Sequence, residues 1–64
     1  MDQQSYLGAV TSVITENMGH ETGELFFKFH ELDEKSEIFL GARSLLEDFM
    51  GPVVTARKLK EFEL

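Results

Sequence analysis

Residues 33–52, DEKSEIFLGARSLLEDFMGP, predict the helix around which the rest of the chain is organised. Its apolar side chains recur at three- and four-residue spacing and so share one helix face: Ile38, Ala42, Leu45, Leu46, Phe49 and Met50. Gly51 and Pro52 predict the end of the helix, because glycine accepts a positive φ and proline cannot continue the hydrogen bonding. We expect Leu45 and Phe49 to be buried where this helix packs against a sheet.

The start of this helix carries residues that suit a helix N-terminus. Asp33 or Ser36 is expected to cap it, because a short side-chain oxygen accepts hydrogen bonds from the first amides. Glu34 and Glu37 follow in the first turn, where the helix dipole favours carboxylates.

The segment before it, residues 3–18, is apolar at helical spacing but rich in β-branched residues, which prefer strands. Strict alternation of polar and apolar residues is absent, so the periodicity favours a helix. Residues 19–23, GHETG, are expected to form a loop after it, with Gly19 as the stop of the helix. The alternative makes residues 5–17 a strand.

Two other segments are predicted to be strands. In residues 24–32, ELFFKFHEL, Leu25, Phe27 and Phe29 alternate with the remaining side chains and would form an apolar face. Residues 53–63 follow the Gly-Pro break with β-branched residues, which favours a strand. A helix is also compatible with residues 53–63, because Val53, Ala56, Leu59 and Phe62 are spaced three apart.

These elements predict a small α+β domain over residues 1–64, with helix, strand, helix and strand in order and both helices on one sheet face. The alternative strand at residues 5–17 gives ββαβ. A chain of 64 residues without cysteine builds only a marginal core. Open strand edges and a small core both favour a second chain, so we expect a homodimer.

The composition is acidic, with twelve acidic and six basic residues and a net charge of −6. Residues 1–50 carry −7 of this, whereas residues 51–64 carry +1. Such a field repels nucleic acid and anionic lipid and attracts basic protein surfaces. No apolar run approaches the ~20 residues of a membrane span. Residues 1–4, MDQQ, lack the positive charge and apolar block of a secretory signal, so we expect none. We therefore expect a cytoplasmic protein that binds neither membranes nor nucleic acid directly.

Catalytic and metal sites are not expected. His20, Glu21 and Glu24 have the spacing HExxE, which lacks the second histidine of a zinc-protease motif. His30 and Glu31 add one further pair, and scattered histidine–carboxylate neighbours are ordinary in an acidic chain. We expect no cofactor and no enzymatic activity.

The candidate partner-binding surface combines acidic residues with apolar ones that lack a place in the expected core. Its members are Glu31, Asp33, Glu34, Glu37, Phe39, Leu40 and Glu47. Phe26 is a further apolar residue that fits this core poorly, whereas basic Arg57, Lys58 and Lys60 are expected on an exposed strand edge. The favoured function is an adaptor or inhibitor that occupies a partner protein. The alternatives are a nucleic-acid mimic that blocks a DNA- or RNA-binding protein, and a self-associating structural subunit.

Overall fold

The computed structural model describes residues 1–64 and contains helices only. Its elements are α1 (Gln3–Met18), α2 (His20–Phe29), α3 (Lys35–Met50), α4 (Pro52–Lys58) and the 3-10 helix η1 (Lys60–Phe62). The prediction of an α+β fold is wrong, and so is its ββαβ alternative, because no strand forms in the chain.

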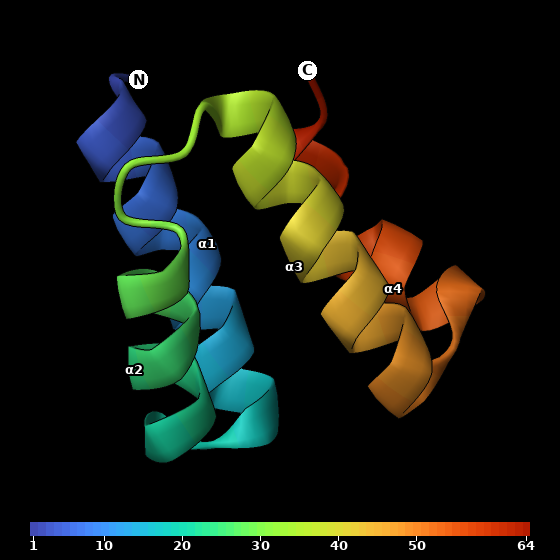
Figure 1. Cartoon of the computed structure of the whole chain (residues 1–64). Coiled ribbons are helices and arrows are strands. Elements are labelled where there is room, and N and C mark those ends of the chain that lie inside the picture. Colours follow the sequence, from blue (N-terminus) through green and yellow to red (C-terminus); the bar gives the residue numbers. More distant parts are fainter.

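Two single glycines connect the helices in pairs (Figure 1). Gly19 joins α1 to α2 with φ 98° and ψ 166°, and Gly51 joins α3 to α4 with φ 85° and ψ 163°. Only glycine adopts this backbone region without strain. The predicted helix stops at both glycines are confirmed, although the loop predicted for residues 20–23 is wrong, since α2 begins directly after Gly19.

The first helix, α1, has the bounds that the periodicity predicts. The Asp2 carboxylate caps it by accepting a hydrogen bond from the Ser5 amide at 2.7 Å. Its buried side chains follow helical spacing: Tyr6, Leu7, Val10 and Ile14. Burial of this stripe outweighs the strand preference of the β-branched residues, because packing overrides intrinsic propensity.

The second helix, α2, replaces the strand predicted for residues 24–32. Its buried positions are Gly23 and Phe26, and His30 at its C-cap is buried four residues further on. The alternating Leu25, Phe27 and Phe29 are exposed. Gly23 allows α2 to approach α1 closely, because a Cβ there would lie 1.9 Å from Thr15 Oγ1. The strand prediction failed because residues 24–32 hold many apolar side chains close together. Such a run includes pairs two residues apart, as in a strand, and pairs three or four apart, as in a helix.

The third helix, α3, has the predicted end but a different N-cap. Glu34 occupies the cap position instead of Asp33 or Ser36, and its amide donates to Glu37 Oε1 at 3.1 Å. Ile38, Ala42 and Leu46 are buried, and Leu45 is half-buried. The expected burial of Phe49 is wrong: its side chain is 59% exposed, because it lies in the last turn beyond the buried stripe.

The C-terminal segment, predicted as a strand over residues 53–63, forms α4 and η1 instead. Pro52 occupies the first turn of α4, where its fixed φ is favourable and its missing amide is not needed. Thr55, Leu59 and Phe62 point into the molecule, while Val53 and Val54 are exposed. The helical spacing of Leu59 and Phe62 therefore predicts this segment correctly, whereas its β-branched residues wrongly favour a strand.

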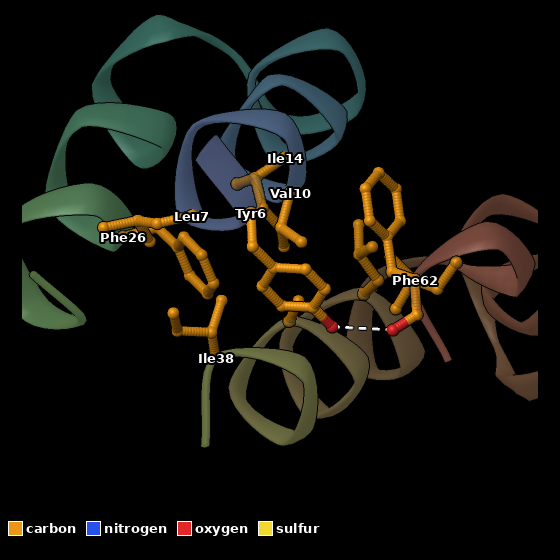
Figure 2. Packing of buried hydrophobic residues seen from close by; sticks show 10 residues of the cluster. Tyr6, Leu7, Val10, Ile14, Phe26, Ile38 and Phe62 are labelled. Carbon is orange, nitrogen blue, oxygen red and sulfur yellow. Dashed lines mark hydrogen bonds between the residues drawn. The ribbon is translucent and has the colours of Figure 1, made fainter. Parts of the chain in front are cut away.

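A single cluster of ten buried side chains forms the core (Figure 2). Its members are Tyr6, Leu7, Val10, Ile14, Phe26, Ile38, Ala42, Leu46, Leu59 and Phe62. The Tyr6 hydroxyl donates to the Phe62 carbonyl at 2.7 Å, and the two rings meet edge to face with centroids 5.8 Å apart. Residues near the two chain ends are thereby held together.

The arrangement of the helices leaves α2 and α3 apart over most of their length. Helix α1 packs against both α2 and α3, and α4 packs against α3. Figure 1 shows α2 and α3 diverging with distance from the loop of residues 30–34 that connects them. None of the helices combines the length and apolar composition that a membrane crossing requires.

Candidate functional site

The space between α2 and α3 is an open groove of about 600 Å³, which we call the α2–α3 groove. From α2 it is lined by Thr22, Leu25, Phe26, Phe29 and His30. From α3 it is lined by Gly41, Ser44, Leu45 and Asp48. Its volume lies within the roughly 300–1,000 Å³ range of ligand-binding clefts, and its walls are mostly apolar.

The narrow end of the groove is where His30 lies against Gly41. A Cβ on Gly41 would come within 2.5 Å of both Cε1 and Nε2 of the imidazole. The ring therefore occupies the space that a side chain at position 41 would need. The Phe26 and Phe29 rings flank the imidazole, with centroid separations of 4.4 and 4.9 Å.

Asp33 fixes the orientation of His30. Its Oδ2 lies 2.8 Å from His30 Nδ1, and its backbone carbonyl accepts a hydrogen bond from Gln3 Nε2. The Asp33 carboxylate is thus engaged by the His30 imidazole, which explains why Asp33 does not cap α3 as the sequence predicted. The contact also joins the end of α2 to the connecting loop beside the narrow end of the groove.

His30 and Ser44 both line the α2–α3 groove, and the Asp33 carboxylate contacts the imidazole of His30. These are the residue types of a hydrolytic triad, but the roles of such a triad depend on geometry. No hydrogen bond joins Ser44 to His30, and the imidazole edge faces the Gly41 backbone. The arrangement orients no nucleophile, and the other lining groups are chiefly hydrocarbon.

Large apolar side chains form the lip of the groove on α2. Leu25 is 68% exposed and Phe29 is 79% exposed, whereas neighbouring Phe26 is only 5% exposed. Exposed leucines or phenylalanines are ordinary when they are isolated. Here they border an apolar groove, and such a continuous patch is typical of a contact surface.

A second, smaller recess of about 330 Å³ lies between α3 and α4. Phe39, Arg43 and Glu47 line it from α3, and Thr55 and Leu59 are among the residues that line it from the C-terminal segment. Arg43 Nε is 3.9 Å from Glu47 Oε2, one helical turn further along α3. The Thr55 hydroxyl is buried without a hydrogen-bond partner.

The structure does not gather the predicted partner-binding residues on one surface. Glu31, Asp33 and Glu34 lie in or beside the connecting loop, and Glu37 follows in the first turn of α3. Phe39 and Glu47 belong to the α3–α4 recess. Whether any of these seven positions contacts a partner stays a prediction.

The expectations for individual apolar residues have mixed outcomes. The idea that Phe26 and Phe39 fit the core poorly is wrong, because Phe26 is buried and Phe39 is half-buried against the core. Leu40 is 52% exposed, which confirms the expectation that it lies outside the core.

The groove does not follow from the sequence when residues 24–32 are interpreted as a strand, because a strand places Leu25, Phe27 and Phe29 on one face. A helical interpretation of residues 20–29 places Thr22, Leu25, Phe26 and Phe29 on adjoining positions of one side. Gly23 and Gly41 were a further signal, since glycine within a helix often marks a close approach of another element.

The remaining candidate residues form no site in the structure. No group of three histidine, aspartate or glutamate side chains is placed to hold a metal ion. His20, Glu21 and Glu24 are exposed in the first turns of α2, and Arg57, Lys58 and Lys60 are exposed on α4 and η1. Comparisons with protein-family models, curated proteins and solved structures give no match for this chain.

Proposed function

We propose that this protein is a non-enzymatic protein-binding module whose α2–α3 groove holds the apolar face of one helix of a partner protein. The observation that supports it is the groove itself, with the largely exposed Leu25 and Phe29 at its lip. A partner that covers these side chains removes apolar surface from water, which is the main favourable term in most protein association. The cytoplasmic location expected from the sequence remains part of the proposal.

A helix is the occupant that suits the shape of this groove. Helix α1 packs against α2 and α3 from one side, and the groove between these two helices stays open. An amphipathic helix that enters such a groove uses apolar residues at three- and four-residue spacing as anchors. The small side chain of Ser44 leaves room on the α3 wall for the anchors of the occupant.

The test selects helical peptides from a displayed random library against the folded protein. Ser44→Phe fills the groove from an exposed position without replacing any core side chain. Ser36→Phe is the matched control, because Ser36 is exposed on the same helix but does not line the groove. Circular dichroism establishes that both variants retain the helical content of the native chain.

Selected peptides are expected to bind the native chain and Ser36→Phe equally and to lose about tenfold or more in affinity for Ser44→Phe. Such a loss corresponds to about 1.4 kcal/mol or more of binding free energy. The proposal fails if the selected peptides bind Ser44→Phe as well as they bind the native chain, or if no peptide is enriched.

A further inference from the structure

The charges around the α2–α3 groove indicate which helix it accepts. We infer that the occupant is a basic amphipathic helix, with lysine or arginine residues flanking its apolar anchors. This inference rests on the proposed function and adds the chemistry of the partner. Residues 20–50, which supply both walls, carry eight acidic and three basic residues, a net charge of −5.

Acidic residues lie along both sides of the groove. Asp48 lines its open end on α3. Glu37 lies on the same side of α3, one turn before Gly41, and Glu21 lies one turn before Leu25 on α2. Glu37 and Glu21 are exposed, so they present their charge to an approaching partner.

Most of the basic residues are placed elsewhere. Lys35 donates to the Met1 carbonyl, and Arg43 lies beside Glu47 on the α4 side of α3. The bases of the C-terminal segment are Arg57, Lys58 and Lys60, and none lines the groove. Lys28 on α2 is the one base near the lip, one residue before Phe29.

The apolar and charged parts of the groove would contribute differently to binding. The apolar lining provides contact area, which mainly sets how slowly the complex dissociates. The acidic rim attracts a basic helix over a longer range, which mainly accelerates association and weakens with added salt. A second copy of this chain would bring two acidic rims together, so charge favours a basic partner over self-association.

The experiment compares two synthetic peptides that share the same leucine stripe at helical spacing. All polar positions of one peptide are lysine, and those of the other are glutamate. Association and dissociation rates are measured with the native chain at low and at physiological salt. The lysine peptide is expected to associate about tenfold or more faster at low salt, and this difference should shrink as salt is added.

Charge-reversal variants test whether the faster association of the lysine peptide depends on the acidic residues beside the groove. Asp48→Lys with Glu21→Lys reverses two rim charges and should slow association of the lysine peptide about tenfold at low salt. The matched control makes the same changes at Glu61 and Glu63, which lie in the C-terminal segment away from the groove, and should slow it much less. Ser44→Phe should weaken binding of the lysine peptide about tenfold or more, as it does for the selected peptides.

The outcomes separate this inference from the proposed function. Equal binding of both peptides, lost in Ser44→Phe, overturns the basic partner and leaves the groove as a binding site. Binding of the lysine peptide that survives Ser44→Phe shows general attraction to an acidic protein and overturns both. Failure of both peptides to bind also overturns both.

Discussion

At the scale of single residues, the Tyr6 hydroxyl links α1 to the C-terminal segment through the Phe62 carbonyl. Tyr6→Phe removes the donor and leaves a buried carbonyl without its partner. We expect a loss of about 1–3 kcal/mol in the free energy of unfolding, measured by urea denaturation at neutral pH. Equal stability of the two chains would mean that the hydroxyl contributes nothing to the fold.

The same tyrosine predicts a sensitivity to alkaline pH. Burial raises the pKa of Tyr6 above its ordinary value of 10.0, because the buried phenolate is poorly solvated. The associated stability is fully present below about pH 10 and falls as the pH rises through the raised pKa. Tyr6 is the only tyrosine and the chain has no tryptophan, so phenolate absorbance reports its titration directly. A titration at the ordinary pKa would contradict this burial, and Tyr6→Phe should show a flatter alkaline loss of stability.

Gly51 provides a second prediction at this scale, because its φ of 85° and ψ of 163° are open only to glycine. Gly51→Ala should destabilise the protein by about 1–3 kcal/mol. The matched control is Gly8→Ala within α1, where a Cβ meets nothing within 4 Å. That change should stabilise by about 0.5–1 kcal/mol. Thermal unfolding distinguishes the two, and a similar effect of both would refute the special role of Gly51.

At the scale of elements, the approach of α2 and α3 depends on His30 lying against Gly41. Gly41→Ala should push the imidazole away and destabilise by about 1–3 kcal/mol, the usual cost of overpacking. The cost should be smaller in a His30→Ala background, because the obstructing ring is then absent. A double-mutant cycle by urea denaturation measures this coupling. Additive effects would show that the two residues do not constrain each other.

At the scale of the whole molecule, the charge around the groove bears on self-association. The homodimer expected from the sequence depended partly on open strand edges, and the structure contains no strands. Two chains could still associate through their α2–α3 grooves. That association would bring together two segments, residues 20–50 of each chain, that each carry a net charge of −5 and repel one another. We therefore expect a 7.3 kDa monomer in sedimentation at micromolar concentration and low salt. A dimer that Ser44→Phe dissociates would make a second copy the occupant of the groove.

Helices α1 and α3 and the two glycine stops could be predicted from the sequence. These features depend on local signals: a long apolar periodicity and backbone conformations that only glycine adopts. Residues 20–29 and 52–62 were predicted wrongly because short apolar runs contain strand and helix spacings together. Only packing against α1 and α3 decided that both segments are helical.

The tertiary structure alone decided where the candidate site lies. Leu25 and Phe29 come from α2, whereas Ser44 and Asp48 come from α3, and no motif in the sequence connects them. They face one groove because α2 packs against α1 at the Gly23–Thr15 contact, and because His30, directly after α2, lies against Gly41 of α3. The angle between the two helices is set by these long-range contacts, which local periodicity does not encode.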